Sequence, residues 1–144
     1  MNLPGKEFFS VDMQALLEGC RTLIQTPGTA GQEQEAANAL RQMLQEAGFD
    51  RVWSDGVGNV IGEIKGELPG PKILFDAQLD AMPVSGSERW SFDPYEGEVS
   101  EGKVYGRGAV GMKGALAAMV QGLAPLAQNK SELPGAVYVS GSIG

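Results

Sequence analysis

Gln78 and Asp80 are the side chains best placed for chemistry, because they follow an apolar run, Ile73-Leu74-Phe75, that predicts a strand. The amide oxygen of Gln78 could contact a cation, although a neutral amide is a poor zinc donor compared with imidazole or carboxylate. Each residue also has a purely structural interpretation. Asp80 could accept backbone N–H bonds in the turn after the strand, and Gln78 could be a satisfied polar residue at the sheet end.

Histidine is absent from the 144 residues. It is the commonest ligand of catalytic zinc and the commonest general base at neutral pH, so ordinary hydrolase chemistry would have to do without it. The single cysteine, Cys20, cannot form an internal disulfide. Its place in an apolar helical stripe predicts a buried, unreactive thiol.

A glycine-rich segment from Gly106 to Gly114 precedes a predicted helix. Glycines at a helix N-terminus can bind anions, but this spacing does not match a dinucleotide fingerprint. We expect Arg107, within this segment, to bridge loop carboxylates or carbonyls rather than to bind a ligand. Trp90 is a weaker candidate for a surface contact with a ligand.

The elements that position these residues follow from apolar spacing. It predicts helices at 13–24, 36–47 and 111–128, strands at 57–65, 72–80 and 136–140, and a hairpin at 98–105. The helix caps are predicted to be Ser10 and a Thr29/Gln32 capping box, while Gly48 ends the second helix. The fold class is therefore α/β, with a mixed β-sheet and helices packed on it.

Within that fold, we expect Lys72 to Asp80 and Ala136 to Ser140 to lie in the interior of one sheet, because their apolar runs suit strands covered on both faces. The segment from Glu67 to Pro71 is predicted to be a loop. Glu33, Glu35 and Glu46 are expected on the solvated face of the second helix.

Two segments resemble the M20 metallopeptidase family. One is Leu74-Phe75-Asp76-Ala77-Gln78-Leu79-Asp80-Ala81-Met82-Pro83-Val84, which is similar to the family's His-x-Asp strand and the turn after it. The other runs from Trp90 to Gly114 and resembles the family's Trp-x-x-x-Pro loop, hairpin and Gly-Arg-Gly-x-x-Asp-x-Lys-Gly helix start. This resemblance implies an amidohydrolase of N-acyl amino acids or small peptides that uses two zinc ions, a bridging water and a glutamate base.

The sequence departs from that pattern at the implied metal ligands. Gln78 replaces the ligand histidine, and Gly111 replaces the aspartate that bridges the metals. Asp80 matches the aspartate that orients the histidine. The resemblance thus predicts residues 1–144 to be an incomplete zinc-peptidase-like catalytic domain, with the lid or dimerisation domain and the C-terminal catalytic segment absent and no zinc bound by this chain.

Three functional hypotheses remain open from the sequence. The first is a degenerate M20 segment without activity of its own, and the second is a binding module that forms a homo-oligomer or pairs with a full-length relative. The third is one piece of a split metallohydrolase. The formal charge of −7 disfavours nucleic acid as a partner, and no apolar run has the roughly 20 residues that cross a membrane. The N-terminus does not resemble a secretory signal, so we expect the cytoplasm.

Overall fold

The computed structural model describes residues 10–86 and 89–144 as a mixed α/β structure. A four-stranded sheet has the order β1-β2-β6-β3, in which only the β3–β6 pair is parallel, and β4 and β5 form a separate hairpin. The strands are β1 (Arg51–Ser54), β2 (Val60–Lys65), β3 (Leu68–Gln78), β4 (Glu98–Ser100), β5 (Lys103–Tyr105) and β6 (Pro134–Ser142). The predicted fold class is confirmed.

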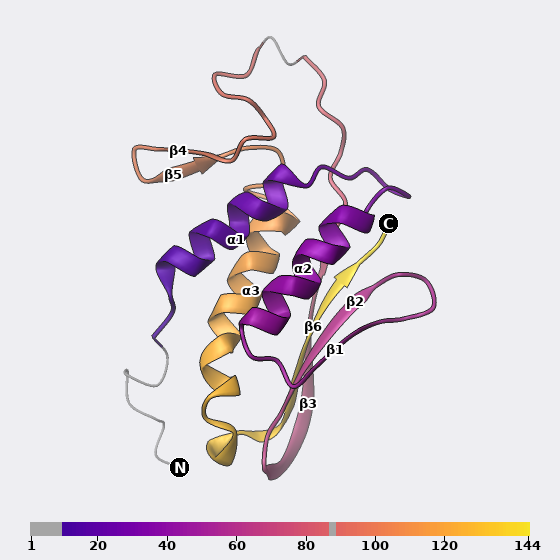
Figure 1. Cartoon of the computed structure of the whole chain (residues 1–144), viewed down its shortest axis with the longest axis vertical. Helices are drawn as coiled ribbons and strands as arrows, with labels where there is room; N and C mark the ends of the chain where they lie inside the picture. The colour runs from indigo at the N-terminus through magenta and orange to yellow at the C-terminus, as the bar shows by residue number, and fades with distance from the viewer. Residues whose placement is uncertain (1–9, 87–88) are drawn as a thin grey trace.

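Three helices lie on one side of this sheet (Figure 1): α1 (Met13–Gln25), α2 (Gln34–Glu46) and α3 (Met112–Ala127). A short 3-10 helix, η3 (Lys130–Glu132), links α3 to β6. Helix α2 packs on β1 and β2, and α3 packs on β3, whereas α1 packs mainly on α3. Their apolar stripes and the covered face of the sheet form one core that includes Leu23, Leu40, Leu44, Leu116 and Val139. No helix in the described ranges is both long and apolar enough to span a membrane.

Both predicted helix caps are wrong. Helix α1 is capped by Asp12, whose Oδ1 accepts bonds of 3.0 Å from the N–H groups of Gln14 and Ala15. A carboxylate at this position satisfies two N–H groups that have no partner within the helix, and it is as good a cap as the predicted serine. Before α2, the predicted capping box is only a backbone turn, and the N-cap residue, Glu33, makes no side-chain capping bond.

The position of β3 in the sheet corrects the prediction most clearly. Strand β6 is interior, as predicted, but β3 is an edge strand, with Ile73 48% exposed and Leu74 60% exposed. It also begins at Leu68, so the predicted 67–71 loop largely belongs to the strand, with an irregularity in pairing between Leu68 and Lys72. An apolar run indicates that the side chains of a strand tend to be buried. It does not indicate whether the strand pairs with one neighbouring strand or with two.

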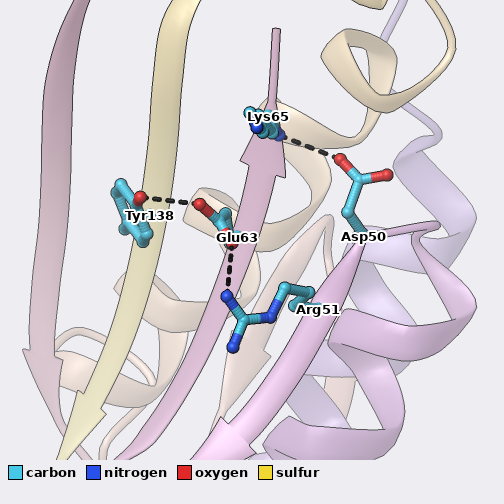
Figure 2. A network of polar contacts seen from close by, with 5 residues as sticks. All are labelled: Asp50, Arg51, Glu63, Lys65 and Tyr138. Carbon is cyan, nitrogen blue, oxygen red and sulfur yellow. Dashed lines mark hydrogen bonds and ion pairs between the residues drawn. The ribbon is translucent and has the colours of Figure 1, made fainter.

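The sheet face opposite the helices carries a row of polar contacts across three strands (Figure 2). The Tyr138 hydroxyl donates a 2.7 Å bond to Glu63, and Arg51 lies 3.5 Å from the other oxygen of that carboxylate. The bond from Tyr138 to Glu63 raises the pKa of the Tyr138 phenol. These three residues are in register on β1, β2 and β6, and the same row ends at Leu74 on β3. The polar contacts therefore link β1, β2 and β6 on this face, and the apolar Leu74 occupies the last position of the row, on β3.

Candidate functional site

Gln78 and Asp80 lie where β3 ends. Because β3 and β6 are parallel, their carboxyl ends meet at one edge of the sheet, which is where α/β proteins commonly place ligands. Gln78 is in register with Ser142, and the N–H of Leu79 continues the ladder with a 2.8 Å bond to the Ser142 carbonyl. Leu79 is buried in the core and fixes the strand end. Gln78 and Asp80 lie on either side of the buried Leu79 in the sequence.

Asp80 has a buried oxygen without a partner. Its Oδ1 is buried and accepts no hydrogen bond, so the turn N–H groups expected to satisfy it do not do so. An unsatisfied buried acceptor costs roughly 1–3 kcal/mol, and such a group in a native fold calls for an explanation. The resemblance supplies one, because the matching aspartate of the family would accept a hydrogen bond from the ring N–H of the histidine that Gln78 replaces.

Gly111 lies directly before α3 at its N-cap position, and no side chain caps the helix there. The loop before Gly111 is held by hydrogen bonds from Arg107 to two other loops. The Arg107 guanidinium donates a 2.7 Å bond to the Met82 carbonyl, and the Arg107 backbone N–H donates a 2.6 Å bond to the Pro94 carbonyl. Arg107 thus bridges two loops through a carbonyl, as the sequence predicted.

One cavity of about 430 Å³ brings these positions together. Its lining includes Gln78, Asp80, Trp90, Arg107 and Gly111. The two implied ligand positions and the orienting aspartate therefore share one cavity, although they are separated by up to 33 positions in sequence. A second hollow, of about 500 Å³ between the three helices, shares no residue with this cavity.

Lys113 was not singled out from the sequence, yet it positions the glycine loop. Its side chain is only 2% exposed, and Nζ donates bonds of 2.7 and 2.8 Å to the carbonyls of Leu23 and Thr26 at the end of α1. Burial lowers the pKa of this ammonium group. The carboxyl end of a helix attracts a cation, so Lys113 ties the start of α3 to α1. Gly108, at φ +90°, lets the backbone pass over this side chain.

Glu33 is buried, with 4% of its surface exposed, and so corrects the prediction that it lies on a solvated helix face. Its Oε1 accepts bonds from the N–H groups of Gly31 at 2.9 Å and Gly144 at 3.2 Å. Burial raises the pKa of Glu33, but these backbone donors outweigh it and hold the pKa below its ordinary range. Glu33 therefore holds the end of the β6 segment near Asp80, whose Cγ lies 3.4 Å from where a Cβ on Gly144 would stand.

The donor set at this cavity does not fit two zinc ions. Among residues 10–86 and 89–144, no three side chains of histidine, cysteine, aspartate or glutamate gather in a group that could hold a metal. Among the described residues that line the cavity, Asp80 is the only one with a carboxylate, and Arg107 adds a positive charge. Structural and catalytic zinc sites use at least three protein ligands.

Comparison with known proteins places these features in a family. The model of peptidase family M20/M25/M40 matches residues 74–142. The succinyl-diaminopimelate desuccinylase of Caulobacter sp. is 32% identical over 139 residues, which are 95% of this chain and 34% of that protein. The Escherichia coli protein YgeY is 31% identical over 113 residues, covering 78% of this chain and 27% of its own length.

Solved structures share the fold. The Bacillus subtilis YXEP protein, described as a dinuclear metal-binding peptidase of the M20 family, matches 98% of this chain and 36% of its own, with 25% identity and a TM-score of 0.71. A metallo-carboxypeptidase from Sulfolobus solfataricus matches 90% of this chain and 31% of its own, with 20% identity and a TM-score of 0.73. The chain thus spans about a third of the length of its relatives, and its sequence and fold identify it as an M20 metallopeptidase-like polypeptide.

Proposed function

We propose that this chain is a non-catalytic M20-like domain that acts by binding rather than by hydrolysing amides. The observation that carries the proposal is the cavity in which Gln78 and Gly111 stand at the two positions where the family resemblance implies metal ligands. A neutral amide and a residue without a side chain cannot replace an imidazole and a bridging carboxylate.

The charges around the cavity support the same conclusion. A two-metal hydrolase site needs several carboxylates or imidazoles to offset the metal charge, and Asp80 is the single carboxylate among the described residues of this cavity. The unpartnered Oδ1 of Asp80 fits a residue whose orienting role has lost its histidine. Arg107, which lines the cavity, and Lys113, which positions the glycine loop beside it, both donate hydrogen bonds to backbone carbonyls.

The test is hydrolysis of N-succinyl amino acids, N-acetyl amino acids and dipeptides with added zinc, with and without a chelator. We expect no chelator-sensitive release of product above the buffer rate. Asp80→Asn, purified identically, is the control, because a contaminating hydrolase would give equal rates in both preparations. Chelator-sensitive hydrolysis by the unmodified chain that Asp80→Asn abolishes would overturn the proposal.

A further inference from the structure

Asn59 is the polar side chain through which the loop between β1 and β2 contacts the end of β6. Its Oδ1 accepts a 3.0 Å bond from the N–H of Ile143, and its Nδ2 donates a 2.8 Å bond to Oδ2 of Asp55. A backbone N–H only donates and a carboxylate only accepts, so these two neighbours fix the orientation of the amide. Asp55 is fixed in turn, because its Oδ1 accepts bonds of 2.9 to 3.0 Å from the N–H groups of Val57, Gly58 and Asn59.

The amide oxygen of Asn59 continues the sheet past the last backbone pair. Backbone pairing of β2 with β6 ends at Val60 opposite Gly141, and the N–H of Ile143 lies beyond that pair. This N–H bonds to a side chain of the loop, where a strand would offer it a carbonyl. The Ile143 side chain packs beside Gly58, where an added Cβ would lie 3.4 Å from Cδ1 of Ile143. The loop therefore holds Ile143 both by a hydrogen bond and by packing.

The peptide group between Ser142 and Ile143 connects this loop to the cavity. Its N–H is the donor to Asn59, and its carbonyl accepts the 2.8 Å bond from the N–H of Leu79. A trans peptide group is planar, so its N–H and C=O point in opposite directions and turn together. Leu79 lies between Gln78 and Asp80, and both of these residues line the cavity. A change in the bond at Asn59 is thus transmitted through one rigid group to the end of β3.

We propose that Asn59, held by Asp55, is a positioning residue for Gln78 and Asp80. Asn59 fixes the peptide group between Ser142 and Ile143, and that group fixes the end of β3. The role is conformational, because Asn59 is not among the described residues that line the cavity. This inference goes beyond the proposed function, since it concerns how the two side chains are held, whichever ligand the cavity takes.

Exchanging the two side chains of the pair tests the proposal by nuclear magnetic resonance, read at the carboxyl carbon of Asp80 and the side-chain amide of Gln78. Asn59→Asp keeps an acceptor for Ile143 but places two carboxylates in contact. It should shift both resonances and speed hydrogen exchange at the Ile143 N–H by about tenfold or more. The double variant Asp55→Asn/Asn59→Asp restores the pair with the donor on the other residue and keeps the net charge, so it should return all three signals toward wild type.

The matched control is Ser54→Ala, at the end of β1. It removes a 2.6 Å bond from Arg41 on the same hairpin but leaves Asp55 and Asn59 in place. It should leave the resonances of Gln78 and Asp80 unchanged. Circular dichroism checks that each variant is folded.

The wild type gives a result that needs no variant. Its Ile143 N–H should exchange slowly although it lies outside the backbone ladder, and fast exchange there would overturn the proposal. Resonances of Gln78 and Asp80 that stay unmoved in a folded Asn59→Asp variant with faster exchange at Ile143 would also overturn it, because Asn59 would then stabilise the loop alone. A folded double variant that fails to recover the signals would do the same. None of these readouts involves hydrolysis, so their failure is distinguishable from failure of the proposed function.

Discussion

At the scale of single residues, the two positions where the family resemblance implies metal ligands line one cavity. Gln78 has an amide where the family resemblance implies an imidazole ligand. Gly111 has no side chain where the resemblance implies a carboxylate ligand. Asp80 keeps a buried oxygen without a partner, at an energetic cost. Lys113 and Arg107, which position the surrounding loops, donate hydrogen bonds to the carbonyls of Leu23 and Met82.

Replacing both positions should restore metal affinity without restoring catalysis. A Cβ on Gly111 would have no neighbour closer than 3.7 Å, and its backbone is not in the left-handed region, so Gly111→Asp fits the loop. Gln78→His would add an imidazole two residues before Asp80, on the same side of the strand. We expect zinc affinity measured by calorimetry to rise by about tenfold or more, with amide hydrolysis at background.

The matched control for that pair is Gln78→His with Gly111→Asn, which keeps the shape of the new side chain and removes its charge. Its zinc affinity should fall well short of the aspartate variant. Turnover by the His/Asp variant would contradict the expectation, because no general base has been added.

Glu33 gives a pH dependence with a defined sign. Its folded-state pKa is held below the unfolded value of about 4.3, so its contribution to stability is fully present above that value. The contribution is lost as the pH falls through the folded-state pKa. Glu33→Gln should therefore melt at a lower temperature than the wild type near pH 7, and the gap should narrow as the pH approaches 3. A gap that widens on acidification would contradict this role.

At the scale of elements, the sequence predicted the helices and most strands, because apolar periodicity reports directly on local burial. Strand β1 was missed because four residues, Arg51 to Ser54, carry too short a pattern. The edge position of β3 could not be predicted from Ile73 and Leu74, since an apolar run is the same whether one neighbour or two cover it. The shared cavity of Gln78 and Gly111 was implied by the family resemblance, whereas Glu33 needed the fold to show its contact with Gly144.

Two glycines should respond to substitution in opposite directions. Gly62 on β2 packs so closely under α2 that an added Cβ would lie 2.8 Å from both Leu44 and Phe49, and Gly62→Ala should cost about 1–3 kcal/mol. Gly122 on α3 is exposed and has no atom within 4 Å of that position. Gly122→Ala should therefore stabilise the fold by about 0.5–1 kcal/mol through helix propensity. Urea unfolding measures both changes, and equal effects at the two sites would contradict the packing described for β2.

At the scale of the whole molecule, one helical layer covers one face of a sheet whose β3 edge is unpaired. The chain spans about a third of the length of its relatives, so their activities, substrates and partners are not carried over to it.

The most direct test of the central claim is elemental analysis of the purified chain after loading with zinc and dialysis. Without histidine, with a buried Cys20 and with no described group of three donors, the chain should retain less than one zinc ion per molecule. Gln78→His/Gly111→Asp, handled in parallel, should retain more. Two tightly held zinc ions on the unmodified chain would contradict the account, because they would mean that Gln78 and Gly111 do not mark the loss of a metal centre.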